Sequence, residues 1–191
     1  MSKPATQSAE RTALVYDDDG LGRPPWGMSS PMLKENYDTE WGLPIFDEAA
    51  LYERLSLESF QSGLSWAVVL KKREAFRAAF CDFDPEKVAQ FTEPDVERLL
   101  GDASIIRNET KIRAAITNAK ATIALREEGG LAEFIWSFQP PENLYPTAME
   151  DIPKKSDESK LMSRELKKKG FRFVGPVTCF ALMEAIGMID T

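Results

Sequence analysis

The sequence predicts an all-α fold, and three observations support this prediction. Apolar residues recur at helical spacing through most of the chain after residue 47. Most of these stretches begin with a capping residue or a proline and end at a glycine, as helices do. Alternating apolar and polar residues are scarce, and FRFVG (171–175) is at most a short extended piece. No internal repeat is present, so we expect a single helical domain.

The first part of the chain lacks the helical pattern. Residues 1–22 are polar and end in the acidic run DDDG, so we expect a disordered tail there. Residues 23–47 are rich in proline and are expected to form an irregular coil that wraps the domain. The single domain is therefore expected to span residues 23–191.

Helices are expected from Asp47 onward. Asp47 can cap a helix that runs to about Ser59, and Ser62 or Gly63 can begin the next one, which contains Trp66. Further helices are expected at 84–88, 92–100, 109–127, 131–138, 157–170 and 176–187, with a proline-bearing loop at 140–156.

The composition excludes several classes of chemistry. The chain has 191 residues, two cysteines, no histidine and a net charge of −7. Without histidine there is no Ser–His or Cys–His arrangement, so acid–base chemistry falls to carboxylates, Lys, Tyr, Cys or water. The distant Cys81 and Cys179 suit a reducing cytosol and cannot complete a structural zinc site. No apolar run is long enough for a membrane span, so we expect a cytoplasmic protein.

The positive charge is concentrated in three segments despite the acidic balance of the whole chain. Residues 154–175 carry a local charge of +5, and residues 71–77 and 105–120 carry +3 each. A molecule with this asymmetry is able to present a phosphate-binding face to a nucleic acid. Ordinary lysine decoration of solvated helix faces explains the same pattern, and charge alone does not separate the two readings.

The stretch ESFQSGLSW (58–66) is the sharpest local feature. Glu58 lies in an otherwise apolar run, where a buried carboxylate needs a partner, a shifted pKa or a cationic ligand. Trp66 offers an aromatic face and Gln61 a hydrogen-bonding amide, so the cluster suits a flat cationic heterocycle. A core tryptophan beside a helix-terminal glutamate has the same spacing and remains the plainer alternative.

The segment VERLLGDASIIRNETKIRAAI has the layout of a helix–hairpin–helix unit at about residues 95–125. Exposed amides in the hairpin and the start of the second helix make a phosphate site, to which Ser104, Arg107 and Lys111 are expected to contribute. An ordinary pair of antiparallel helices with basic decoration is the alternative.

A second basic run, SRELKKKG, ends the helix expected at 157–170. Lys168 and Lys169 are candidates for contact with a DNA backbone. Lysines near a helix C-terminus also complement the helix dipole without any further function.

Four stretches together resemble the DNA-3-methyladenine glycosylase I family, a bacterial branch of the helix–hairpin–helix DNA glycosylases. They are YDTEWGLP (37–44), LESFQSGLSWAVVLKKREAFRAAFCDFDPEKVA (57–89), IIRNETKIRAAITNA (105–119) and LKKKGFRFVGPVTCFALMEAIGMI (166–189). They occur in the order and spacing of that family and cover roughly residues 31–190. The resemblance implies a helix–hairpin–helix glycosylase fold in which the N- and C-terminal segments form a small accessory subdomain.

The resemblance also implies an activity. The enzyme would flip 3-methyladenine out of alkylated double-stranded DNA and release it by hydrolysis, as a monofunctional base-excision repair glycosylase without lyase activity. By matching position, Glu58 would be the catalytic carboxylate that faces the cationic base and Trp66 the stacking ring. Gln61, Asn36 and Tyr37 would complete the base-binding set. A bacterial, nucleoid-associated monomer without a membrane partner is expected.

Three departures from the family pattern bear on this expectation. The family often ties its termini with a zinc ion, whereas Pro24 and Tyr37 stand at two ligand positions here, so no metal or other cofactor is expected. Asn36 replaces an aromatic residue of the family's pocket, and Ser104 replaces the usual hairpin glycine. A paralogue with altered alkylated-base specificity therefore stays open as an alternative, as does a non-catalytic helical DNA-binding module.

Overall fold

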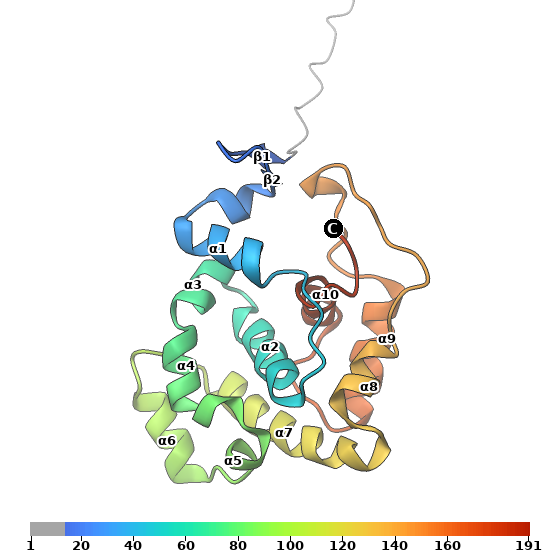
Figure 1. Cartoon of the computed structure of the whole chain (residues 1–191). Coiled ribbons are helices and arrows are strands. Elements are labelled where there is room, and N and C mark those ends of the chain that lie inside the picture. The colour runs from blue at the N-terminus through green and yellow to red at the C-terminus, as the bar shows by residue number, and fades with distance from the viewer. Residues whose placement is uncertain (1–13) are drawn as a thin grey trace, which may run out of the picture.

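The computed structural model describes residues 14–191 and is mostly helical (Figure 1). The expected all-α fold is confirmed by its similarity to solved structures, described below. Two short strands, β1 (Val15–Tyr16) and β2 (Gly22–Arg23), form an antiparallel pair near the N-terminus. The helices are α1 (Pro31–Thr39), α2 (Glu48–Gln61), α3 (Trp66–Lys71), α4 (Arg73–Ala79), α5 (Pro85–Ala89), α6 (Glu93–Gly101), α7 (Glu109–Leu125), α8 (Gly130–Trp136), α9 (Asp157–Lys168) and α10 (Pro176–Ala185). Single 3-10 turns lie at Pro25–Met28, Cys81–Phe83, Arg126–Glu128 and Met149–Asp151.

The N-terminal region is more ordered than the sequence suggests. Residues 14–22 belong to the β1–β2 hairpin rather than to a disordered tail, and residues 1–13 lie outside the described part of the chain. The expected coil at 23–47 contains α1, because Ser30 caps it by accepting a hydrogen bond from Leu33 N at 3.2 Å and Pro31 occupies its first turn. The mixed polarity of α1 hides it from a periodicity search.

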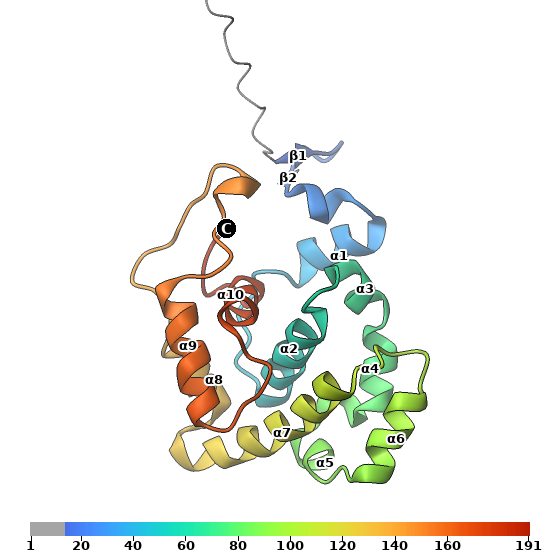
Figure 2. The same ribbon diagram turned by 180° about the vertical axis from the view of Figure 1, so that it is seen from behind.

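Helix α2 is the central element of the fold, with α7, α8 and α10 packed around it (Figures 1 and 2). Nine of its residues are buried, and Asp47 caps it as expected by accepting from Ala50 N at 2.9 Å. The Tyr52 hydroxyl donates to Ala115 O at 2.7 Å, which pins α2 to α7. Both partners of this bond are in the core, so it satisfies a buried hydroxyl and sets the register between the two helices.

The loop after α2 starts helix α3 later than the sequence suggests. Gly63 adopts φ +80°, a conformation that glycine tolerates, and Leu64 N donates to Gln61 O at 2.6 Å. The cap of α3 is consequently Ser65, not Ser62 or Gly63. The expected continuous second helix is also broken at Lys72, between α3 and α4. Trp66 therefore stands at the first position of a short helix, at the rim of the core.

The N-terminal elements and the end of the chain lie at the same end of the molecule (Figures 1 and 2). Gly42 N donates to Ala185 O at 2.9 Å, which ties the loop after α1 to the end of α10. Gly187 has φ +70°, and a Cβ there would stand 2.1 Å from Gly42 O, so only glycine permits this approach. The contact brings Trp41 next to α10.

Candidate active site

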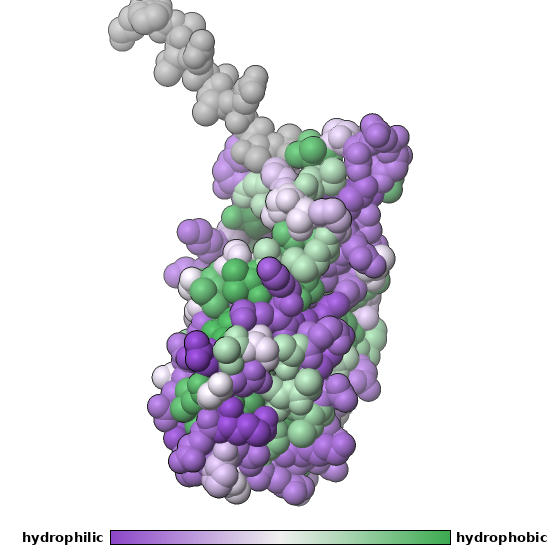
Figure 3. All heavy atoms as spheres, turned by 90° about the vertical axis from the view of Figure 1, so that its left-hand side faces the viewer, coloured by the Kyte–Doolittle hydropathy of each residue, from purple (hydrophilic) through white to green (hydrophobic). Residues whose placement is uncertain are grey.

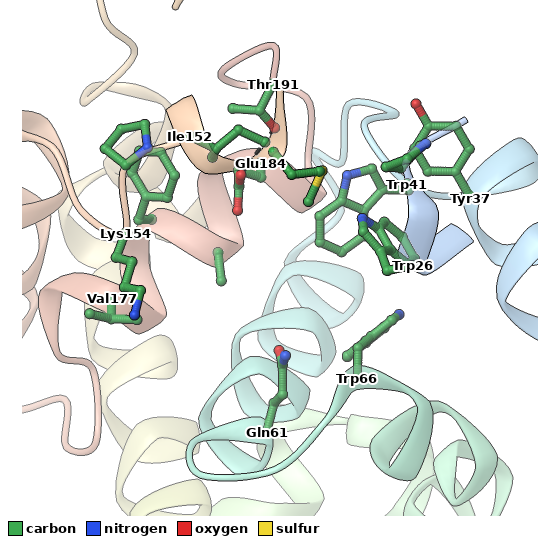
Figure 4. A pocket seen from close by; sticks show the side chains of 15 residues that line it. Trp26, Tyr37, Trp41, Gln61, Trp66, Ile152, Lys154, Val177, Glu184 and Thr191 are labelled. Atoms are coloured by element: carbon green, nitrogen blue, oxygen red, sulfur yellow. Dashed lines mark hydrogen bonds between the residues drawn. The ribbon is translucent and has the colours of Figure 1, made fainter. Parts of the chain in front are cut away.

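A pocket of about 340 Å³ opens between α1, the start of α3 and α10 (Figure 4). One wall is aromatic and the opposite side carries the loop before α9 and the outer face of α10. Pockets of this size with an apolar wall and a few polar groups are the usual form of a small-ligand site. The lining residues are Pro24, Trp26, Tyr37, Trp41, Gln61, Trp66, Met149, Ile152, Pro153, Lys154, Val177, Phe180, Ala181, Glu184 and Thr191.

The aromatic wall is a chain of edge-to-face contacts. The ring of Trp26 lies 5.5 Å from Tyr37 and 4.9 Å from Trp41, centroid to centroid, and Trp41 lies 6.3 Å from Trp66. Edge-to-face packing of this kind fixes ring orientations and adds to the stabilisation from area burial. Tyr37 and Trp66, which sequence reasoning singled out, line the pocket together with Trp41, which it did not single out.

Asn36 lies behind this wall. Its side chain is 2% exposed, and its Oδ1 accepts a hydrogen bond from Trp66 Nε1 at 2.9 Å. Asn36 therefore does not line the pocket but orients the ring that does. Gln61, at the end of α2, lines the pocket as expected, and its amide points into it (Figure 4).

Glu58 is paired with an arginine of its own helix. Its side chain is closed to solvent, and Oε1 accepts a hydrogen bond from Arg54 Nε at 3.1 Å, one helical turn away. The Arg54 guanidinium in turn lies 4.3 Å from the ring centre of Trp66 and 5.1 Å from that of Trp41. Burial raises the pKa of the Glu58 carboxyl, and the charge of Arg54 opposes that shift.

The carboxylate of Glu58 thus lies beneath the aromatic wall and not on its surface. The i, i+4 spacing of Arg54 and Glu58 on one helix is the signal in the sequence that indicates this pair. Glu58 Oε2 and Arg54 Nη2 have no hydrogen-bond partner among the described residues. The charged groups of Arg54 and Glu58 therefore lie directly behind the tryptophans that a ligand would meet.

Glu184 is the carboxylate that does line the pocket. It projects from α10, and its Oε1 accepts a hydrogen bond from Thr191 Oγ1 at 3.0 Å (Figure 4). Burial, with the charge of Glu58 nearby, raises its pKa to about 7. Sequence reasoning missed Glu184, although a lone glutamate in the apolar stretch FALMEAIG is the same kind of signal that singled out Glu58.

The helix–hairpin–helix unit is present as α6, a tight turn and α7. Asn108 caps α7 by accepting from Lys111 N at 3.0 Å, and Ser104 and Arg107 are exposed in the turn. Ser104 donates from both its amide and its hydroxyl to Asp102 Oδ1, at 2.9 and 2.5 Å. The turn therefore has a defined conformation even with serine in place of glycine.

Lys111 does not lie on the surface expected to face DNA. It is 6% exposed, and its Nζ donates to the carbonyl oxygens of Phe60 at 2.8 Å and Ser62 at 2.6 Å. These carbonyls belong to the end of α2 and the loop that follows, where the last helical carbonyls lack intrahelical donors. The lysine is therefore a structural cap of α2, and burial lowers its pKa.

Seven of the sixteen Lys and Arg residues in the three basic segments are paired with carboxylates. Lys168 pairs with Glu165 at 2.9 Å and Lys169 pairs with Glu128. Arg73 pairs with Glu40 at 2.5 Å on the side of the molecule that carries α4. On that side, hydrophilic residues surround separate hydrophobic patches (Figure 3). These pairs favour the reading of solvated helix faces for part of the positive charge.

The residues at the expected zinc positions do not fit a zinc ion. Pro24 offers no ligand atom, and the ring of Tyr37 packs against Trp26. Within residues 14–191 no group of three or more His, Cys, Asp and Glu side chains is placed to hold a metal. The N-terminal segment is instead held by a buried arginine: Arg23 Nε donates to Asp38 Oδ1 and Nη2 to Asp19 Oδ2, both at 2.6 Å.

Comparison with known proteins decides the family. Residues 26–191 match the family model of methyladenine glycosylase. The chain belongs to the methyladenine glycosylase family. DNA-3-methyladenine glycosylase 1 of Escherichia coli is 44% identical over 168 residues, covering 86% of this chain and 90% of that protein. DNA-3-methyladenine glycosylase of Haemophilus influenzae is 41% identical, covering 88% and 92%.

Solved structures of this family have the same fold. A crystal structure of 3-methyladenine DNA glycosylase I superposes with a TM-score of 0.83 at 41% identity, covering 87% of this chain and 93% of the other. The Staphylococcus aureus structure solved for 3-methyladenine recognition gives 0.82 at 38% identity, covering 86% and 89%. The predicted family and all-α glycosylase fold are therefore confirmed. Among residues 14–191 no helix is long and apolar enough to cross a membrane.

Proposed function

We propose that the chain is a monofunctional base-excision glycosylase that hydrolytically releases 3-methyladenine from alkylated double-stranded DNA. The observation that carries this proposal is the tryptophan-walled pocket with a carboxylate in it, in a chain of the methyladenine glycosylase family. A flipped base is held in such pockets by stacking and by hydrogen bonds to its edge. Its relatives are named for 3-methyladenine, which supports the choice of base.

Release of 3-methyladenine requires little acid catalysis from the protein. Methylation at N3 makes the adenine ring cationic, so the C1′–N9 bond is already weakened. When that bond breaks, its electron pair moves to N9 and the base leaves as a neutral molecule. Water then adds to the sugar carbon and loses a proton. What the pocket has to supply is preferential binding of a flat cation, and aromatic faces and negative charge both do this.

The side chains divide this task in a way that the geometry suggests. Trp66 would stack on the base, with Asn36 fixing its ring from behind. Tyr37 would extend the wall and Gln61 would hydrogen-bond the base edge. Glu58 would act as an electrostatic group through the wall, in concert with Arg54. Each of these roles is a proposal that substitution can test.

Contact with the duplex would come from the hairpin between α6 and α7. Ser104 and Arg107 are exposed there, and Lys72 fixes the turn by donating to Ser104 O at 3.2 Å. An exposed arginine in a tight turn suits a DNA phosphate. Lys168 stays a candidate for a peripheral contact. Action as a monomer and location in the cytoplasm stay predictions.

A specific observation favours a second candidate, a glycosylase with a changed choice of alkylated base. Arg54 places a positive charge behind Trp66 and partly neutralises Glu58, so the pocket attracts a cation less than a free carboxylate would. A less charged pocket discriminates less between cationic and neutral lesions. Parallel assays on DNA carrying 3-methyladenine, 7-methylguanine and hypoxanthine would separate the two candidates.

The deciding experiment is chromatography of bases released from methylated duplex DNA. We expect release of 3-methyladenine, and a fall in kcat/KM of at least about tenfold for Trp66→Ala because stacking on one base is lost. Phe46→Ala is the matched control, since Phe46 is exposed and stacks on Trp136 outside the pocket. A folded protein that binds DNA without releasing any base would contradict the proposal. Failure of borohydride to trap the protein on DNA would support hydrolysis without a lyase step, since Lys154 lines the pocket.

A further inference from the structure

We propose that Glu184 is the carboxylate that recognises the flipped base in this chain, by accepting a hydrogen bond from the edge of the purine. This inference rests on the proposed function and assigns a specificity-determining residue within it. It moves the direct contact from Glu58 on α2 to Glu184 on α10.

Of the two carboxylates, only Glu184 is accessible from the pocket. Glu58 is sealed from the pocket by the aromatic wall and is held by Arg54, with its side chain fully buried. Reaching it would require a base to displace a guanidinium stacked 4.3 Å from Trp66. Glu184, by contrast, lines the pocket directly and projects between its two walls (Figure 4).

The carboxylate of Glu184 is held in one orientation. Thr191 donates to Oε1 of Glu184, which fixes the carboxylate plane, and Oε2 has no hydrogen-bond partner among the described residues. One oxygen is thus anchored while the other is left to accept. An exocyclic amine of a purine carries two N–H donors, which suits a single acceptor held in place.

The protonation state of Glu184 responds to the charge of the bound base. Burial and the neighbouring Glu58 raise the pKa of Glu184 to about 7, so near neutral pH the empty pocket holds this group partly protonated. A cationic base favours the ionised form and would drive out the proton. A neutral normal base gains no such attraction. The interaction therefore discriminates between damaged and undamaged adenine.

The other charged and titratable groups around Glu184 do not perform this role. Lys154 is cationic and lies on the opposite wall, and Tyr37 is held neutral because burial raises its pKa. Asp190 is exposed at the chain end, beside the threonine that anchors Glu184. Arg54 and Glu58 act only through the wall. Among these groups, Glu184 alone combines negative charge with a place in the pocket.

Calorimetric titration with free 3-methyladenine, together with the pH profile of kcat/KM on methylated duplex DNA, tests the inference. Glu184→Gln should lower kcat/KM on methylated DNA, where the base is still a cation, at least about tenfold, and should remove the fall in kcat/KM below pH 7 that we expect of the wild-type protein. Binding of the free base, which is neutral, should change less, because the amide oxygen still accepts a hydrogen bond. Glu58→Gln should keep this fall but move it to lower pH, because Glu184 is intact and the charge of Glu58 no longer raises its pKa. Glu127→Gln, at an exposed glutamate of the 3-10 turn after α7, is the matched control and should change neither quantity.

A second variant guards against misfolding of Glu184→Gln. Thr191→Val removes the hydrogen bond that lowers the pKa of Glu184, so the fall in kcat/KM should move to higher pH while the carboxylate remains. An unchanged kcat/KM for Glu184→Gln and an unchanged pH profile in both variants would overturn the inference, while base release by the wild-type protein would leave the proposed function intact. If the wild-type protein neither binds nor releases 3-methyladenine, the proposed function fails and this inference fails with it.

Discussion

Arg54 and Glu58 form an ion pair that is closed to solvent and lies beneath the ring of Trp66. The two residues lie one helical turn apart on α2, with Arg54 Nε 3.1 Å from Glu58 Oε1. The guanidinium also stacks against two tryptophans of the pocket wall. A buried pair of this kind is expensive to break but adds little net stability over an apolar equivalent. Its significance is therefore electrostatic: it sets the charge that a ligand meets through the wall.

Removing Arg54 alone should destabilise the fold. Arg54→Met leaves Glu58 buried without a counter-charge, so we expect the free energy of unfolding to fall by about 3 kcal/mol at pH 8. The loss should shrink as the pH falls, because a protonated Glu58 tolerates burial. Urea unfolding at pH 5.5 and 8 measures both quantities. The double variant Arg54→Met/Glu58→Gln should recover most of the stability, and equal stability of Arg54→Met and wild type would contradict the account.

Glu184 should make the fold less stable as the pH rises. Its pKa in the folded state is about 7, above the ordinary value of 4.5, so the folded protein binds its proton more tightly. The resulting stability is fully present below about pH 4.5 and is lost as the pH rises through 7. Allowing for partial exposure, we expect about 1–3 kcal/mol. Thermal unfolding of Glu184→Gln should therefore show a gain over wild type that grows from pH 5 to pH 8, with Glu127→Gln following wild type throughout.

Lys111 should contribute to stability through its contacts with the end of α2. Lys111→Met removes the donor from the carbonyls of Phe60 and Ser62, and we expect a loss of about 2 kcal/mol. Lys120→Met, on an exposed position of the same helix, should change stability by less than about 0.5 kcal/mol. Denaturant titration of both variants measures the difference, and equal losses would show that the buried contacts of Lys111 carry no special weight.

Arg107 should contribute to DNA affinity where Lys111 does not. Arg107 is exposed in the hairpin, so Arg107→Ala should lower the slope of log affinity against log salt by about one. Lys111→Met should leave this slope unchanged, because its ammonium is already engaged by two carbonyl oxygens. Binding of a fluorescently labelled duplex at several salt concentrations distinguishes the two. The same slope for Arg107→Ala and wild type would remove the hairpin from the interface.

Arg23 should hold the N-terminal hairpin without the help of a metal. Its guanidinium bonds to Asp19 and Asp38, and these bonds hold the pKa of the Asp38 carboxyl below its usual range. We expect Arg23→Met to speed hydrogen exchange in residues 14–23 and to leave α7 unchanged. Since a carboxyl with a lowered pKa loses its contribution as the pH falls, acidification should loosen the same segment. A chelator should leave the melting temperature unchanged, and a fall would mean that a metal does bind.

Local sequence signals predict most of the helices and part of the pocket. The cap at Asp47 and the proline at the first position of α10, Pro176, mark helix starts that the structure shows, because both signals depend on the residue itself. Helix α1 is not predicted from the sequence, because it has few apolar positions. The β1–β2 pair is too short to show an alternating pattern. The break at Lys72 depends on tertiary packing, which periodicity does not see.

The members of the pocket are harder to predict because they come from distant parts of the chain. Trp66 and Gln61 share one local motif, and both line the same pocket. Glu184 follows Glu58 by 126 residues, and only the folded chain brings the two carboxylates close enough to influence each other. For Arg54, the spacing from Glu58 is visible in the sequence, but its position beneath the tryptophans is not.

The tryptophan wall has a practical consequence. Three of the four tryptophans of the chain line the pocket, and the fourth, Trp136, lies outside it with its Nε1 donating to Ile45 O at 2.8 Å. Most of the intrinsic fluorescence of the protein therefore originates beside the ligand site. A base that enters the pocket changes the surroundings of three tryptophans at once. Binding can therefore be followed in real time from the tryptophan emission of the unlabelled protein, with Trp136 as an internal reference.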